Sequence, residues 1–316
     1  MKDYKVYAPI IIPTLCRYEH LKRCIESLSR CTYADKTELV IGLDYPLNNF
    51  HWEGYKRICD YVDSGIIGFK TVTTFKRKNN FGVLKNFEDI KEYALKNYDR
   101  FIFSEDDNEF SPNFLDYTNW GLETFKDDKS VLAICGFKRV AITNYQNNVY
   151  RYPRFNAWGF GIWDDRDQLF ENAKDHALMK NKLNELPLST IFSDNLFVAS
   201  SYMGMIAKNE FLYDSLIPLF PNPNMHCIFP TISKVRNYGH DGQGIHGGSI
   251  KSFNYYTSLP IDTEKNFIPI IKEALFQDRF DKIYKRTYNK IKKKYFMWCM
   301  FQFFIYKLTG KIFFYK

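Results

Sequence analysis

Three consecutive carboxylates, Glu105-Asp106-Asp107, are the part of this sequence best suited to chemistry. They follow a short apolar run, Phe101-Ile102-Phe103, and precede Ser111-Pro112, a pair typical of a helix start because serine caps and proline fits the first turn. Hard divalent cations such as Mn²⁺ and Mg²⁺ prefer oxygen ligands and bind one or two carboxylates together with substrate phosphates. The triplet therefore predicts a cation site for a phosphorylated ligand. The alternative is that the acids only favour the positive end of the following helix.

The elements that must position this triplet alternate along the first third of the chain. Buried apolar runs and helical spacings predict strands over 6–12, 38–43, 69–75 and 100–104, and helices over 19–28, 52–62 and 82–95. This alternation predicts an α/β fold with a mainly parallel sheet and helices on both faces. Ligands of such sheets bind outside the carboxyl ends of the strands, where 14–17, Asp44 and the triplet are expected to meet.

Composition places the chain among globular proteins. Its 316 residues are 45% hydrophobic, enough for a sizeable core. The seven cysteines form no CxxC pair and are interpreted as reduced thiols of a cytosolic protein. We expect neither a secretory leader at the amino terminus nor a transmembrane helix, because no apolar run reaches about 18 residues.

The second half is less regular. Aromatic and glycine-rich pieces at 157–163 and 238–244 are interpreted as an irregular extension that completes a site, and not as an independent domain. We therefore expect one domain over 1–275, with 126–275 as the less regular part, and a basic and aromatic helical tail over 276–316.

The segment around the triplet, 103–117, resembles the metal-binding segment of the N-acetylglucosaminyltransferase I family, in which a strand ends in Glu-Asp-Asp, a motif of the DXD type, and a Pro-(Asp/Asn)-Phe helix follows. The run 12–17 is similar to the first nucleotide loop of that family, and 81–86 to the segment before its metal strand. Bacterial surface-polysaccharide glycosyltransferases carry similar runs. The resemblance covers roughly residues 6–125 and implies a Rossmann-like glycosyltransferase fold of the GT-A type. It also implies that 1–125 is the nucleotide-sugar-binding part, and that 126–275 is the acceptor-binding part with the closing loop of the same domain.

This resemblance implies specific roles. Asp107 would be the direct ligand of Mn²⁺ or Mg²⁺, and the nucleotide-sugar donor would contact a set of neighbours: Pro13, Thr14, Arg17, Asp44, Lys85, Asn86, Glu105 and Asp106. Arg17 can instead be a solvated capping side chain, and Asp44 or Asn86 a turn former. The run 233–247 looks like the family's flexible closing loop, with His240 or His246 as donors to the diphosphate. The alternative there is a plain glycine-rich turn.

An inverting transfer needs a general base that takes the proton of the acceptor hydroxyl. By chain order Asp194 lies where the family places its base, with Asp165 and Asp164 as competitors that can equally start a helix beside Arg166. Trp158 and Trp163 flank glycines and can stack on an acceptor sugar, or pack in the core.

The carboxyl-terminal tail is the last feature. Seven of the thirteen residues of 282–294 are basic, and an aromatic run, 295–306, follows. The run is too short to span a bilayer but suits an anionic membrane surface. A terminal helix packed on the body is the alternative. No nucleic-acid motif accompanies the basic run, so nucleic acid is not expected as a partner.

These features favour a cytoplasmic glycosyltransferase at the inner face of the cell membrane, which moves a sugar from a nucleotide donor, by analogy UDP, to a glycan or lipid-linked glycan in bacterial surface-polysaccharide synthesis. Two other hypotheses remain: a nucleotide- or glycan-binding module with a degenerate catalytic site, and a nucleic-acid-binding protein that uses its basic tail.

Overall fold

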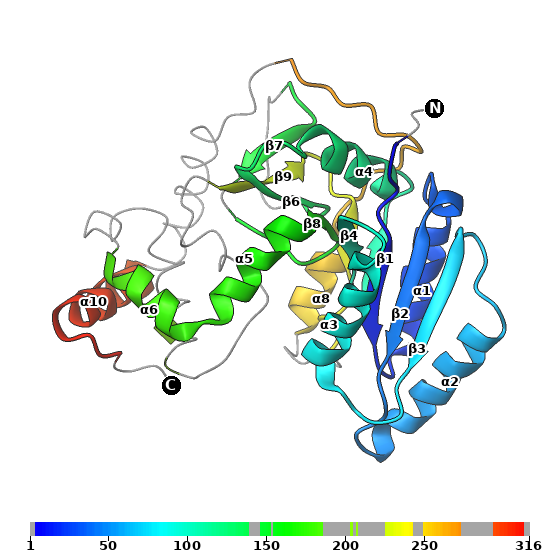
Figure 1. Cartoon of the computed structure of the whole chain (residues 1–316), viewed down its shortest axis with the longest axis horizontal. Coiled ribbons are helices and arrows are strands. Elements are labelled where there is room, and N and C mark those ends of the chain that lie inside the picture. Colours follow the sequence, from blue (N-terminus) through cyan, green and yellow to red (C-terminus); the bar gives the residue numbers. More distant parts are fainter. Residues whose placement is uncertain are drawn as a thin grey trace.

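The computed structural model describes residues 4–138, 146–152, 154–185, 203–204, 207, 225–242, 249–272 and 293–312. Eight strands of these segments form one sheet in the order β3-β2-β1-β4-β8-β6-β9-β7 (Figure 1). Its strands are β1 (Ile10–Thr14), β2 (Glu38–Leu43), β3 (Thr71–Lys76), β4 (Arg100–Phe103), β6 (Val131–Cys135), β7 (Val149–Tyr152), β8 (Phe160–Trp163) and β9 (His226–Pro230). Neighbours are parallel from β3 to β4 and between β6 and β9, whereas β8 and β7 run antiparallel to their neighbours. The predicted α/β fold with a mostly parallel sheet is confirmed.

Helices cover both faces of this sheet. The helices of the described residues are α1 (Tyr18–Ser29), α2 (Trp52–Asp63), α3 (Gly82–Leu95), α4 (Phe114–Thr124), α5 (Asp164–Lys174), α6 (His176–Glu185), α8 (Ile250–Thr257) and α10 (Lys293–Thr309), with single 3₁₀ turns η1 (Ala34–Lys36) and η2 (Asn49–His51). Side chains of β1 alternate between two apolar clusters, as the period of two in a strand requires. Ile10 and Ile12 pack with α1, α2 and α4, whereas Ile11 packs with α3 and α5.

A second, two-stranded sheet ties the two halves of the chain together. β5 (Asn108–Phe110), directly after the acidic triplet, pairs antiparallel with β10 (Val235–Asn237). α6 and α10 lie apart from the main sheet, at the end of the molecule opposite α2 (Figure 1). In the part of the chain that the structure describes, no helix is both long and apolar enough to cross a membrane.

Most elements of the first third agree with their predicted ranges; 38–43 and 82–95 agree at both ends. The first strand does not, because β1 continues through Pro13 to Thr14. The carbonyls of Pro9 and Ile11 accept bonds from the β4 side, so the odd positions of β1 face that strand. β4 ends at Phe103, and the missing N–H of Pro13 therefore leaves no ladder bond unmade.

Two expectations were wrong. Ser111 does not cap the following helix: α4 begins at Phe114 behind Asn113, and the Ser111 hydroxyl donates to the Asn113 side chain at 3.0 Å. The piece 157–163 is also not irregular throughout. Its second half is β8, which lies between β4 and β6 in the centre of the sheet.

Gly161 allows α4 to pack directly on β8. A Cβ at this position would lie 2.5 Å from Thr118 Cγ2 and 3.0 Å from Leu122 Cδ1. We expect Gly161→Ala to lower the free energy of unfolding by about 1–3 kcal/mol, the usual cost of overpacking a core. Denaturant unfolding measures the loss. Gly161→Ala/Thr118→Ser, which removes the clashing methyl group, should recover part of it; an unchanged unfolding midpoint for Gly161→Ala would contradict the packing.

Candidate functional site

A buried pair of carboxylates lies at the carboxyl end of β4. Asp106 and Asp107 form the turn between β4 and β5 and are only 4% and 7% exposed. The Thr14 hydroxyl, at the end of the neighbouring β1, donates to Asp106 Oδ2 at 2.8 Å. Arg17 donates through Nη1 to Asp107 Oδ2 at 2.8 Å and through Nη2 to Asp106 Oδ1. One guanidinium thus pairs with both buried carboxylates and balances one of their two negative charges.

Local structure explains why Arg17 can reach both acids. It occupies the N-cap position of α1, but its side chain makes no capping hydrogen bond. β1 and β4 are neighbouring parallel strands, so the loop after β1 and the turn after β4 lie at the same edge of the sheet. The Arg17 side chain extends from this loop to the turn at 106–107. The interpretation of Arg17 as a solvated capping residue is therefore wrong.

The second half of the chain closes the other side of Asp107. Asn237, at the end of β10, donates through Nδ2 to Asp107 Oδ1 at 2.7 Å, and the Tyr238 amide donates to the Asp107 carbonyl at 2.8 Å. A Cβ on Gly239 would lie 2.2 Å from Asp107 Oδ2, so only glycine fits beside this carboxylate. Both oxygens of Asp107 therefore have protein partners from different halves of the chain.

Burial and mutual repulsion set the electrostatics of the pair. Burial raises the pKa of Asp106, the Arg17 guanidinium opposes this shift, and the charge of Asp107 adds to it. Burial alone would lower the pKa of Arg17, but Asp106 and Asp107 outweigh it and raise that pKa above its ordinary value. Arg17 is thus held as a cation at this site.

The chemistry of this donor set suits a divalent cation in part. Carboxylate oxygens are the hard ligands that Mn²⁺ and Mg²⁺ prefer. The Arg17 guanidinium already places a positive charge beside Asp107. Gly239 adds no side-chain atom beside Oδ2, where a Cβ would clash. Among the described residues, no group of three or more His, Cys, Asp or Glu side chains is placed to hold a metal. Asp107 can thus contribute a ligand, and substrate phosphates would have to complete the shell.

Other predicted donor contacts lie at the same edge of the sheet but are engaged by the protein. Asp44 follows β2, its amide donates to the Thr14 carbonyl, and its carboxylate accepts from the amides of Phe81 and Gly82 at 2.7 and 2.9 Å. Asn86 is buried on α3 and donates to the Gly42 carbonyl at 2.7 Å. Both residues thus hold α3 against β2.

The remaining predicted donor residues differ in exposure. Glu105 is half-buried in the same turn, and its carbonyl accepts from the Ser104 hydroxyl at 2.7 Å. Pro13 lies on β1 opposite Gly42. Lys85 is exposed on α3, with Nζ 4.5 Å from the centre of the Phe81 ring. The structure therefore brings Glu105 and Pro13 to the site, while Lys85 lies on the rim of the same edge.

An aromatic cluster adjoins the acidic pair. His240, one residue beyond Gly239, stacks on Tyr256 of α8 with ring centres 4.4 Å apart, and Trp158 meets Tyr256 edge to face at 4.9 Å. All three rings are half-buried. The structure thus places Trp158 and His240 beside the site, and His246 lies outside the described residues.

Three predicted residues lie at the wrong end of the sheet. Trp163 pairs with Arg100 at the start of β4, is buried, and donates to the Leu122 carbonyl at 3.1 Å. The Asp164 amide bonds the Asp99 carbonyl at that end, and Asp165 pairs with Arg166 at 2.8 Å. The antiparallel direction of β8 takes all three away from the acidic turn, so Trp163 is a core residue and the two acids start α5. Asp194 lies outside the described residues.

Sequence reasoning missed Asn237, Gly239 and two contacts that hold the segment 238–242 on α1. His20 bonds Asp241 at 2.9 Å, and Arg23 lies 4.1 Å from the centre of the Tyr238 ring. Asn237 sits within the run interpreted as a flexible loop, but it ends a strand. Alternation of the short run 235–237 was the available sign, and it is too brief to identify a strand.

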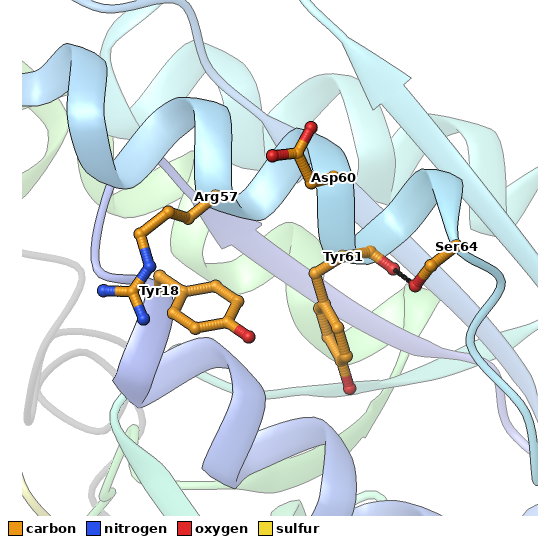
Figure 2. A pocket seen from close by; sticks show the side chains of 5 residues that line it. All are labelled: Tyr18, Arg57, Asp60, Tyr61 and Ser64. Carbon is orange, nitrogen blue, oxygen red and sulfur yellow. Dashed lines mark hydrogen bonds between the residues drawn. The ribbon is translucent and has the colours of Figure 1, made fainter.

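A separate hollow of about 310 Å³ lies between α1 and α2 (Figure 2). Figure 2 shows the Tyr18 ring between Arg57 and Tyr61, and the Arg57 guanidinium lies 4.1 Å from the centre of the Tyr18 ring. Asp60 and Ser64 complete the lining. None of the predicted site residues lines it, so this hollow is distinct from the acidic site.

No protein-family model matches the chain, and no curated protein matches it in sequence. Among solved structures, a mannosyltransferase from Pyrobaculum calidifontis in complex with GDP-Man and Mn²⁺ is 14% identical with a TM-score of 0.36, covering 54% of this chain and 50% of that one. TarS from S. aureus in complex with UDP-GlcNAc is 12% identical with a TM-score of 0.34, covering 53% and 47%. Mouse xyloside xylosyltransferase 1 is 10% identical with a TM-score of 0.33, covering 71% and 84%. The match thus spans about half the length of the first two structures, and likenesses this distant assign no activity to this chain.

The contacts of Asn86 predict a structural role. Asn86→Ala leaves the Gly42 carbonyl and Arg77 Nε without their partner and should lower the free energy of unfolding by about 1–3 kcal/mol. Denaturant unfolding, with exposed Lys85→Ala on the same helix as the control, measures this effect. If Asn86→Ala were as stable as Lys85→Ala, the bonds to Gly42 and Arg77 would not be what keeps Asn86 in place.

Proposed function

We propose that this chain is a glycosyltransferase that moves a sugar from a UDP-sugar donor to a glycan or lipid-linked glycan acceptor, with inversion, in bacterial surface-polysaccharide synthesis. The observation that carries the proposal is the buried Asp106–Asp107 pair, compensated by Arg17, at the edge of the sheet where β1, β2 and β4 end. Ligands of parallel α/β sheets bind at this edge. Buried ion pairs add little to the stability of a fold. We therefore assign this cluster a role in binding a charged ligand.

The donor would lie with its diphosphate at the acidic turn. Arg17 can donate to phosphate oxygens from its place between β1 and α1, and Glu105 and Asp106 would orient hydroxyl groups of the ribose or the sugar. Pro13 and Thr14, at the end of β1, would contact the donor beside these acids. Asp44 and Asn86 contribute by fixing the start of α3, which borders the site. Lys85 on that rim would attract the anionic donor.

Asp107 would hold a divalent cation, Mn²⁺ or Mg²⁺. When bound, the cation would neutralise negative charge that develops on the diphosphate as the sugar leaves. Asn237 keeps the Asp107 carboxylate in its orientation through the bond to Oδ1. Gly239 keeps the space beside Oδ2 free of side-chain atoms.

The acceptor would enter from the side of the aromatic cluster. Trp158 would pack on the apolar face of a sugar, and His240 and His246 would donate to the diphosphate. Asp194 is the proposed base: it takes the proton of the acceptor hydroxyl, whose oxygen attacks the anomeric carbon as the bond to the diphosphate breaks. The products are the lengthened glycan and UDP.

The metal assignment predicts the behaviour of Asp107→Ala. This variant should lose the part of donor binding that depends on Mn²⁺, at least about tenfold in affinity, because it removes the only proposed protein ligand. Thermal shift and calorimetry with UDP-sugars, with and without Mn²⁺, measure the difference.

Two variants control this experiment. Asp165→Asn, a matched acid at the far end of the sheet, should bind donor as the wild type does. Asp194→Asn should also bind donor but fail to transfer sugar. Equal donor affinity of the wild type with and without Mn²⁺ would rule out the metal role of Asp107.

We also propose that the chain binds an anionic membrane surface through its carboxyl-terminal helix, α10. Gln302, Phe303 and Tyr306 of α10 are buried, and the Tyr306 hydroxyl donates to the Lys180 carbonyl of α6 at 3.2 Å. The other face exposes large apolar side chains spaced as one helical stripe: Met297 (69%), Phe301 (52%), Phe304 (49%) and Leu308 (69%). The basic run 282–294 ends in the first turn of this helix. An apolar stripe beside many lysines suits the surface of an anionic bilayer.

The stripe predicts the effect of Phe301→Ser/Phe304→Ser/Leu308→Ser. Vesicle affinity should fall by roughly a hundredfold or more, because each such side chain contributes about 1.5–3 kcal/mol when it leaves water. Flotation with phosphatidylglycerol vesicles measures it. The matched control, Leu47→Ser/Phe50→Ser/Ile67→Ser, removes three apolar side chains that are more exposed than those of α10 and should float normally. Undiminished flotation of the first variant would exclude α10 as the membrane contact.

A further inference from the structure

Arg17 makes two ion pairs that are not equivalent. Its Nη2 bonds Asp106, which is the more buried acid and is also held by Thr14. Its Nη1 bonds Asp107, whose other oxygen is held by the neutral amide of Asn237. Because the two bonds use different nitrogens, the guanidinium can give up Asp107 and still keep Asp106.

We infer that Arg17 is an exchangeable counter-ion of the site: it holds Asp107 in the donor-free protein, and on donor binding it keeps Asp106, turns Nη1 to the donor diphosphate and leaves Asp107 to a divalent cation. This inference rests on the proposed function and adds the regulation of its site. It makes Arg17 both a donor ligand and a barrier to cation binding when no donor is present.

Charge balance requires such an exchange. Two adjacent carboxylates, each less than a tenth exposed, would repel an anionic diphosphate unless positive charge lies between them. The single guanidinium already balances only one of the two negative charges. A diphosphate adds more negative charge, so further positive charge must arrive with it. Asp107 Oδ2 is the atom at which it can arrive, because its partner there is Arg17 Nη1, the group that turns to the diphosphate in this exchange.

The surroundings of Asp107 allow Arg17 to leave. Asn237 Nδ2 and the Tyr238 amide hold the Asp107 carboxylate and carbonyl without any contribution from Arg17. The acid therefore keeps its orientation when the Nη1 bond opens. Asp106 anchors the guanidinium meanwhile, so a rotation of the Arg17 side chain is sufficient and α1 need not move.

A consequence is that cation and nucleotide bind cooperatively. The donor-free protein must break the Arg17–Asp107 pair before Asp107 can bind a cation, whereas the diphosphate supplies a new partner for Nη1. By linkage, each ligand raises the affinity for the other by the same factor. Part of that factor comes from direct contact of cation and phosphate, and the part due to Arg17 is lost when Arg17 is replaced.

The test is Mn²⁺ binding to the full chain without nucleotide, followed by the electron paramagnetic resonance signal of free Mn²⁺. Arg17→Gln should bind Mn²⁺ roughly 5- to 150-fold more tightly than the wild type, the range of ordinary coupling between sites. Addition of UDP should raise Mn²⁺ affinity strongly in the wild type and less in Arg17→Gln. Asp107→Asn should bind no Mn²⁺ in either background.

Arg23→Gln is the matched control. It removes one positive charge from the same helix next to Tyr238 but does not touch Asp107. A general electrostatic effect would make Arg17→Gln and Arg23→Gln bind Mn²⁺ alike, and that result would overturn the exchange. The exchange would also be overturned if Arg17→Gln bound Mn²⁺ with the same affinity as the wild type. If Arg17→Gln is unstable because it leaves Asp106 uncompensated, Arg17→Gln/Asp106→Asn removes that charge too and must show the same gain.

The result also separates this inference from the proposed function. If wild type and Arg17→Gln bind neither Mn²⁺ nor UDP, and no UDP-sugar is hydrolysed, both the exchange and the glycosyltransferase proposal are wrong. If UDP and Mn²⁺ bind but Arg17→Gln shows no gain, only the exchange is wrong.

Discussion

The structure depends on the pairing of two adjacent buried carboxylates with one guanidinium. Asp106 and Asp107 are both buried and both contact Arg17, and removing one partner of such a buried ion pair costs about 3–5 kcal/mol. Arg17 makes both contacts from the loop between β1 and α1. The position of β1 beside β4, the short loop and the start of α1 are therefore all constrained by the same three side chains.

This constraint extends to the second half of the chain. β10 pairs with β5, the strand that directly follows Asp107, and so places Asn237 and Gly239 against that carboxylate. His20 and Arg23 of α1 hold the segment that follows. The site is consequently assembled from two distant parts of the sequence, and α1 contacts both.

The sequence predicted the first third of the fold because its information is local. Runs such as 38–43 and 82–95 carry their own period and end at polar residues, so neither needs a distant partner to be identified. The acidic turn, Thr14 and Arg17 could be identified as candidate site residues because they directly follow these predicted strands.

β8 was missed because an aromatic, glycine-containing piece becomes a strand only when β4 and β6 pair with it. Trp163, Asp164 and Asp165 were misplaced for the same reason, since strand direction is a property of the sheet. Asn237 belongs to a strand of three residues, which is too short for any period to show.

The contacts also divide the polar residues at this edge into two kinds. Asp44 accepts hydrogen bonds from the backbone amides of Phe81 and Gly82, and Asn86 donates to the backbone carbonyl of Gly42. These two side chains therefore hold α3 in place whatever the ligand is. Arg17 and Asp107 instead bond each other by side chains alone, and such a pair can be exchanged for other charges without loss of secondary structure. Sequence position alone cannot separate these kinds, because both consist of polar residues just beyond strand ends. The distinction requires the hydrogen-bond partners, and it is the reason that the exchange we propose is assigned to the Arg17–Asp107 contact.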